Sequence, residues 1–211
     1  LMGTVTYRIG AREVEATRTT PEAPEVQRML RQMADEGCGA GVMEVSSHAL
    51  ALRRVDGTRF AAAVFTNLTR DHLDFHEDME DYFVAKRRLF EMLPPEAPAI
   101  VNLDDPRGPA LTEVVTRPVT YAINRPADVS PGPLSYSLTG LRFEVRTPQG
   151  TVHVRSRLVG RPNVYNILAA AATAASLGLP LDAIERGFEQ LSGVPGRFEL
   201  ASTPDDDITV V

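Results

Sequence analysis

Three side chains in the first half of the sequence have the types and spacing to handle a metal ion and a phosphate. Glu44 comes at the end of a short apolar run, residues 41–45, and His72 follows a second run, residues 60–66. An acid at the end of a buried strand often holds Mg²⁺ in folds that hydrolyse nucleotides. Because ligands bind outside the carboxyl ends of strands in a doubly wound sheet, we expect Glu44 and Asn67 to share one crevice, with His72 nearby. The alternative for Glu44 is an ion pair with an arginine at the sheet edge.

The third side chain is Lys86, which falls in the middle of an apolar stripe on the helix expected over residues 78–93. At about 100° per residue, the stripe consists of Met79, Tyr82, Phe83, Leu89, Phe90 and Leu93. Burial disfavours a charged ammonium, so the pKa of Lys86 should fall and leave some neutral amine at neutral pH. A neutral amine can attack CO₂ and become a carbamate, an anion able to bind a metal ion. The alternative, which periodicity alone favours, is that the ammonium reaches water past the stripe.

The segment 71–76 allows two functional interpretations and one structural one. His72 and His76 are four residues apart, which on a helix would place both on one face, and with Asp74 they would suit a zinc hydrolase. Alternatively, only one histidine binds a metal ion, beside Glu44. The structural interpretation is that these residues cap the helix that follows. We favour His72 as the functional residue and His76 as a structural one.

Polar residues near two expected helix starts have the chemistry to hold an anion. Thr19 and Thr20 precede a helix, where Thr19 with the glutamate three residues later also matches a capping box. Asn163 and Asn166 similarly fit the N-cap and first turn of the helix that they open. Arg197, just past a flexible turn, fits either an ordinary surface arginine or one that swings onto phosphates.

Apolar periodicity predicts an α/β fold in which strands alternate with helices. We expect a hairpin over residues 5–16 and helices near 19–37, 78–93, 163–177 and 181–191. Short buried strands are expected at 41–45, 60–66, 99–103 and 119–123. This alternation predicts a doubly wound, mostly parallel sheet covered on both faces. Residues 134–158 break the rhythm and predict a small antiparallel β insert.

Composition narrows the class of protein. With 22 Lys+Arg against 28 Asp+Glu, the net charge of −6 favours neither nucleic acid nor an anionic membrane as a partner. The single cysteine, Cys38, excludes an internal disulfide and fits a reducing compartment. The longest apolar run, residues 167–179, is too short to span a bilayer, so we expect a soluble, cytoplasmic protein. The sequence begins and stops abruptly, which predicts a part of a longer polypeptide.

Three stretches together resemble one enzyme family. They are MEVSSHAL at residues 43–50, FTNLTRDHLDFH at residues 65–76, and NVYN at residues 163–166 followed by GRFE at residues 196–199. In order and spacing they resemble the Mur ligases, and among these the members that add the third residue of the peptidoglycan stem peptide. The resemblance covers nearly the whole chain.

The resemblance implies the fold of the central ATP-binding domain of these ligases, which is similar to P-loop NTPases, over residues 1–199. The antiparallel insert would occupy about residues 134–158, and residues 200–211 would begin a truncated C-terminal ligase domain. The phosphate loop of the family, G-x-x-x-x-G-K-[ST], should lie just before residue 1, after an N-terminal UDP-binding domain. Since the sequence contains neither, we expect the fragment alone to be inactive.

The resemblance also implies roles for the candidate residues. Glu44 and His72 match the Mg²⁺ ligands of the family, and Lys86 matches its carbamylated lysine, which helps to position a second Mg²⁺. The positions that bind ATP in the family correspond to Asn163, Asn166 and Arg197, and those that hold the muramoyl-dipeptide correspond to Thr19, Thr20, Ser46 and Arg54. Together with Glu44, His72 and Lys86, Arg197 would be catalytic. Leu52 replaces a glutamine contact of some members, and Arg18 replaces an asparagine.

The implied activity is ATP-dependent formation of an amide bond. The D-glutamyl carboxylate of UDP-N-acetylmuramoyl-L-alanyl-D-glutamate would attack the γ-phosphate of ATP, and the amine of diaminopimelate or lysine would capture the acyl phosphate. One alternative is another ligase of the superfamily, such as folylpolyglutamate or cyanophycin synthetase, against which Thr19-Thr20 and Ser46-Ser47-His48 argue. The other is a metal-dependent hydrolase that uses His72, Asp74 and His76.

Overall fold

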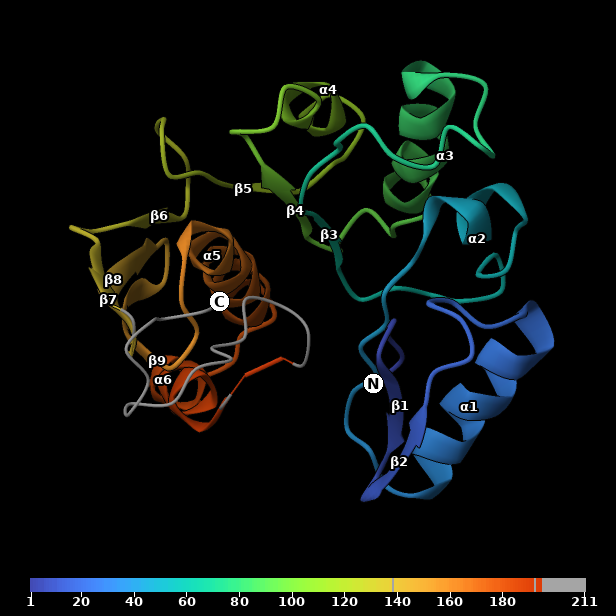
Figure 1. The fold of residues 1–211 in the computed structure, drawn as a ribbon, viewed down its shortest axis with the longest axis horizontal. Coiled ribbons are helices and arrows are strands. Elements are labelled where there is room, and N and C mark those ends of the chain that lie inside the picture. The colour runs from blue at the N-terminus through green and yellow to red at the C-terminus, as the bar shows by residue number, and fades with distance from the viewer. Residues whose placement is uncertain (138, 192, 195–211) are drawn as a thin grey trace, which may run out of the picture. The chain divides into compact units, whose positions relative to one another are not determined.

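The computed structural model describes residues 1–137, 139–191 and 193–194, whose path Figure 1 traces. The chain divides into two compact units: the first consists of residues 1–60 and 69–94, and the second of residues 61–68 and those from 95 onward. Arg197 and the expected start of a further domain at 200–211 lie outside the described residues. Within the described part, no helix is both long enough and apolar enough to cross a membrane.

The first unit is built on a β-hairpin and three helices. Strands β1 (Thr6–Ile9) and β2 (Arg12–Glu15) pair antiparallel, and Gly10 adopts a φ of 55° in the turn, which glycine tolerates without strain. Helix α1 (Ala23–Asp35) contributes Met29 and Met33 to a buried cluster with Tyr7 and Ile9. Helix α2 (Ser47–Ala51) lies against α3 (Met79–Glu91).

The second unit contains the parallel sheet. Strands β3 (Ala63–Phe65), β4 (Ala99–Asn102) and β5 (Pro118–Tyr121) are parallel in the order β3-β4-β5, and α4 (Gly108–Thr112) packs near β4. The antiparallel insert consists of β6 (Ser130–Pro131), β7 (Ser135–Ser137), β8 (Gly140–Thr147) and β9 (Gly150–Ser156), all joined through β8. Helix α5 (Arg161–Ser176) packs on β4, β5 and β8, and α6 (Leu181–Gln190) packs on β9. One apolar core therefore joins α5 to both sheets of this unit.

The architecture agrees with the α/β fold predicted from the sequence, including the parallel strands and the insert. Three local predictions were wrong. Residues 41–45 form no buried strand: Met43 makes a single parallel bridge with Met2, and Val42 is 65% exposed. The capping box at Thr19 does not form, because α1 begins at Ala23 and its N-cap residue makes no side-chain hydrogen bond. Asn163 is not an N-cap, since Gly160 occupies that position.

Candidate functional site

Lys86 is half-buried in the apolar stripe of α3, as its spacing predicts. Its Nζ lies 5.2 Å from the centroid of the Tyr82 ring. Burial lowers the pKa of Lys86, and the negative charges of Glu44 and Asp71 oppose this shift without cancelling it. The expected lowering of this pKa is confirmed, so a larger fraction of neutral amine is present at neutral pH than on an exposed lysine.

His72 is held in a strained backbone conformation beside the same tyrosine. Its φ of 56° lies in the left-handed region, which costs energy for a residue other than glycine and is often found at functional sites. The turn is stabilised by the Asp71 carboxylate, which accepts from the His72 N–H at 2.8 Å, and by the His76 N–H, which donates to the His72 carbonyl at 3.0 Å. The imidazole lies 5.7 Å from the Tyr82 ring, between centroids. Tyr82 therefore contacts both His72 and Lys86.

Glu44 is exposed and is oriented by a residue that sequence reasoning missed. Thr4 donates to Glu44 Oε2 from its hydroxyl at 2.6 Å and from its N–H at 3.3 Å, and the Thr4 hydroxyl also lies 3.2 Å from that of Thr19. No local spacing links Thr4 to a glutamate 40 residues away. Both hydrogen bonds go to Oε2, so among the described residues Oε1 stays available to a cation.

The residues expected to hold the dipeptide are joined by hydrogen bonds. The buried Thr20 hydroxyl donates to the Glu44 carbonyl at 2.9 Å and accepts from the Ser46 N–H at 3.0 Å. Arg54 donates to the Thr20 carbonyl at 3.3 Å and pairs with Glu22 at 2.9 Å. The Nε of Arg54 is buried and has no hydrogen-bond partner among the described residues. Thr19 connects to this group through Thr4.

His76 is engaged at both ring nitrogens. Nε2 lies 2.9 Å from the Ser47 hydroxyl and Nδ1 lies 3.0 Å from Asp81 Oδ2, and the residue is 2% exposed. The arrangement has the order of a serine hydrolase triad, but Ser47 is 1% exposed and no substrate can reach it. His76 instead ties α2 to α3. Within the part of the chain that the structure describes, no three His, Cys, Asp or Glu side chains are grouped to hold a metal ion, so the proposed zinc arrangement is not formed.

The donor set in the first unit suits a hard cation. Mg²⁺ prefers oxygen ligands, and Glu44 offers a free carboxylate oxygen while a carbamate on Lys86 would offer more. The negative charge of Glu44 acts to raise the pKa of Lys86, so the two side chains are close enough to interact electrostatically. Glu44 and a carbamate on Lys86 would therefore supply oxygen ligands of the kind that a magnesium ion prefers.

Asn163 and Asn166 belong to the second unit, on the first turns of α5. Asn163 donates to the Val159 carbonyl at 2.8 Å, and Asn166 donates to Asn163 Oδ1 at 3.0 Å. Asn67 belongs to this unit too, so its expected crevice with Glu44 stays a prediction. The role expected for Arg197 lies outside the described residues.

Comparison with known proteins identifies the family. A family model described as the Mur ligase middle domain matches residues 1–174. The chain belongs to the Mur ligase family. Its relatives include the UDP-N-acetylmuramoyl-L-alanyl-D-glutamate–2,6-diaminopimelate ligases of Gloeobacter violaceus, 47% identical over 211 residues, and of Geobacter metallireducens, 46% identical over 218 residues.

These matches cover 100% of the chain but only 43% and 42% of the two Mur ligases, so the chain spans less than half their length. A solved structure of a 2,6-diaminopimelate ligase of the same name superimposes with a TM-score of 0.80 and 33% identity, covering 90% of this chain and 40% of that one. The Mur ligase fold is thus shared over nearly all of the chain.

Proposed function

We propose that this chain is the central part of an ATP-dependent amide ligase that adds 2,6-diaminopimelate to UDP-N-acetylmuramoyl-L-alanyl-D-glutamate. The observation that carries the proposal is the match of the whole chain, at 47% identity, to a relative of that name. It favours diaminopimelate over lysine, which the sequence left open. ATP and a UDP-linked substrate are cytoplasmic compounds, so the reaction would take place in the cytoplasm.

The first unit would orient the dipeptide and the metal ion. Thr19, Thr20, Ser46 and Arg54 would hold the muramoyl-dipeptide, with the guanidinium of Arg54 close to its carboxylates. Glu44 and His72 would hold Mg²⁺, and carbamylated Lys86 would position a second ion. The metal would supply charge neutralisation on the phosphates of ATP.

The second unit would hold the nucleotide through Asn163 and Asn166, and Arg197 would complete the ATP site. An oxygen of the D-glutamyl carboxylate attacks the γ-phosphorus, and ADP leaves. The amine of the incoming amino acid then attacks the acyl carbon, loses a proton, and displaces phosphate. The step requires in-line attack of the carboxylate on the γ-phosphorus and stabilisation of the charge that develops there.

The test is an assay with UDP-N-acetylmuramoyl-L-alanyl-D-glutamate, ATP, Mg²⁺ and either diaminopimelate or lysine. The complete polypeptide that carries this chain should form the diaminopimelate product and ADP in equal amounts, with little lysine product. The 211-residue chain alone should form neither, because it lacks the G-x-x-x-x-G-K-[ST] loop. Product formation by the chain alone, or no ATP-dependent product from the complete polypeptide, would contradict the proposal.

A further inference from the structure

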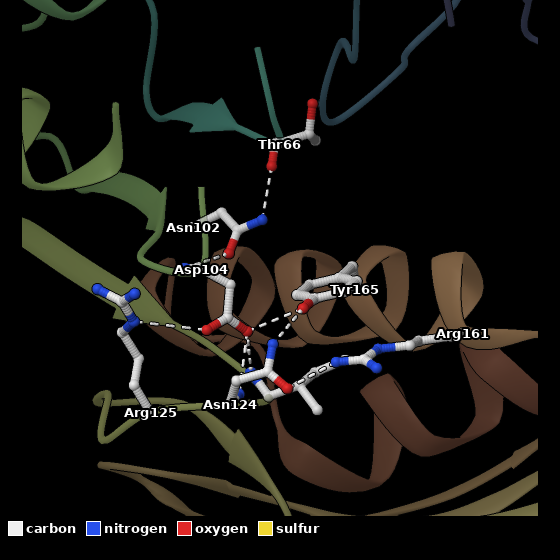
Figure 2. Close-up of polar contacts among 8 residues, drawn as sticks. Thr66, Asn102, Asp104, Asn124, Arg125, Arg161 and Tyr165 are labelled. Atoms are coloured by element: carbon white, nitrogen blue, oxygen red, sulfur yellow. Dashed lines mark hydrogen bonds and ion pairs between the residues drawn. The ribbon is translucent and has the colours of Figure 1, made fainter. Parts of the chain in front are cut away.

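A hydrogen-bonded row of polar groups crosses the carboxyl ends of the three parallel strands (Figure 2). Asn102, at the end of β4, donates to the Thr66 carbonyl at 2.7 Å, and its Oδ1 accepts from the Asp104 N–H at 3.0 Å. Asp104 Oδ2 accepts from the N–H groups of Ile123 at 2.7 Å and Asn124 at 3.0 Å. Thr66 follows β3 and Ile123 comes soon after β5, so the row joins all three strand ends.

The row continues onto the first turns of α5. The Tyr165 hydroxyl donates to Asp104 Oδ2 at 2.8 Å, and Arg161 donates to Asn124 Oδ1 at 2.6 Å, as Figure 2 shows. The N-cap residue of α5 is Gly160, which has no side chain to cap the helix. Besides the hydrogen bond of Asn163 to the Val159 carbonyl, polar contacts to the start of α5 come from the loops that follow β4 and β5.

Asp104 is the centre of this row. Its side chain is 7% exposed, Oδ2 accepts three hydrogen bonds, and Oδ1 lies 3.6 Å from Arg125 Nε without a hydrogen-bond partner among the described residues. Burial raises the pKa of Asp104, but the N–H groups of Ile123 and Asn124, with Tyr165 and Arg125, outweigh it, so this pKa is below its usual value. The carboxylate stays ionised, and its hydrogen bonds are of the stronger, charge-assisted kind.

In the sequence, Tyr165 lies between Asn163 and Asn166, the two asparagines of the proposed nucleotide site. Because successive residues of a helix are about 100° apart around the axis, a contact at Tyr165 fixes the rotation of the turn that carries Asn163 and Asn166. A hydrogen bond of 3.0 Å links the Asn166 amide to that of Asn163. A small rotation of this turn would therefore misplace both.

We propose that Asp104 is a positioning residue that, through the Tyr165 hydroxyl, orients Asn163 and Asn166 toward the nucleotide. This inference rests on the proposed function of the two asparagines. In this role Asp104 itself would touch no substrate. Its loss should weaken ATP binding more than it slows the chemical step.

The test compares Tyr165→Phe and Asp104→Asn in the complete ligase by steady-state kinetics. Tyr165→Phe removes the charge-assisted hydrogen bond to Asp104 and the one that the hydroxyl accepts from Asn124 Nδ2 at 3.2 Å, which predicts a KM for ATP raised about fivefold. In Asp104→Asn the KM for ATP should rise about tenfold or more. The kcat and the KM for the muramoyl-dipeptide should stay within about twofold. The matched control is Asp128→Asn, because Asp128 Oδ2 accepts from the N–H and hydroxyl of Thr120 at 2.8 and 2.6 Å without a hydrogen bond to α5.

The outcomes separate the inference from the proposed function. A raised KM for ATP in both variants but not in Asp128→Asn supports the inference, whereas an unchanged KM, or an equal loss of all kinetic constants, overturns it. Asn166→Ala should raise the KM for ATP by itself. If it does not, the proposed nucleotide site is contradicted, independently of the role of Asp104. Hydrogen exchange of the backbone amides of residues 164–166 gives a second readout without nucleotide. Exchange should be faster in Tyr165→Phe, and unchanged protection would overturn the positioning role.

Discussion

The two units hold their polar side chains in opposite ways. In the first, Glu44 is exposed with one carboxylate oxygen available, Lys86 is a half-buried amine with a lowered pKa, and His72 sits in a strained backbone conformation. In the second, Asn102 is buried and the side chain of Asp104 is 7% exposed, and both form hydrogen bonds with backbone groups, Asp104 also with Tyr165. The difference indicates that the first unit keeps its groups available for chemistry, while the second uses them to fix geometry.

The largest expected effect comes from removing the amine of the first unit. Lys86→Ala should lower kcat about a thousandfold in the complete ligase, since electrostatic groups at the transition state typically contribute about 10²–10³ each. Arg87→Ala is the matched control, because Arg87 is the next residue of α3 and forms an ion pair with Glu91 at 2.8 Å. Equal losses of kcat in the two variants would show that Lys86 has no special role.

The pH profile of the same reaction sharpens this point. Carbamate formation needs the neutral amine, so activity should rise with pH as Lys86 loses its proton. Because burial lowers the pKa of Lys86, the rise should occur at lower pH than for an ordinary exposed lysine. If activity begins to rise only near the pKa of a free lysine, burial does not lower the pKa of Lys86 in the working enzyme.

Substitutions of Glu44 and Thr4 test whether the proposed metal-binding carboxylate is oriented by its neighbour. Glu44→Gln should lower kcat about a hundredfold and raise the Mg²⁺ concentration needed for half-maximal rate. Thr4→Val should produce the same pattern at about threefold to tenfold, since it removes the hydroxyl that donates to Glu44 at 2.6 Å. If Thr4→Val changes the rate without moving the Mg²⁺ dependence, Thr4 acts on something other than the carboxylate.

His76 departs from this pattern in the first unit, as the buried Thr20 does, because both of its ring nitrogens have partners. His76→Ala should reduce the free energy of unfolding by about 2–3 kcal/mol, because it leaves a cavity and the buried Ser47 hydroxyl without its partner. His153→Ala, at a side chain 65% exposed, should change it by less than about 0.5 kcal/mol. Chemical denaturation measures the free energy of unfolding of each variant. If His76→Ala lowers it as little as His153→Ala does, His76 does not hold α2 on α3.

The smallest expected effect concerns the second unit at low pH. The pKa of Asp104 is lower in the folded state than in the unfolded one, so its contribution to stability is complete above the unfolded pKa. That contribution is lost as pH falls through the folded pKa. Unfolding free energies measured between neutral and acidic pH should therefore fall less steeply in Asp104→Asn than in the unsubstituted chain. An identical pH slope would show that this carboxylate is not stabilised by its partners.

Local patterns in the sequence were sufficient to predict much of this molecule. Alternation predicted the hairpin and helical periodicity predicted α3. The stripe around Lys86 left open a lowered pKa or an ammonium that reaches water, and burial does lower this pKa. Contacts between distant residues could not be found in this way. The bonds of Thr4 to Glu44 and of Tyr165 to Asp104 span 40 and 61 residues, and no periodicity encodes them. Residues 41–45 look like a buried strand in composition, yet only packing against neighbours decides whether an apolar run is covered.

The most direct test of the availability of the first unit's groups is carbon-13 NMR of the chain in labelled bicarbonate at neutral pH. A carbamate resonance should appear, disappear in Lys86→Arg and persist in Arg87→Ala. No carbamate resonance, or one that survives in Lys86→Arg, would contradict this prediction.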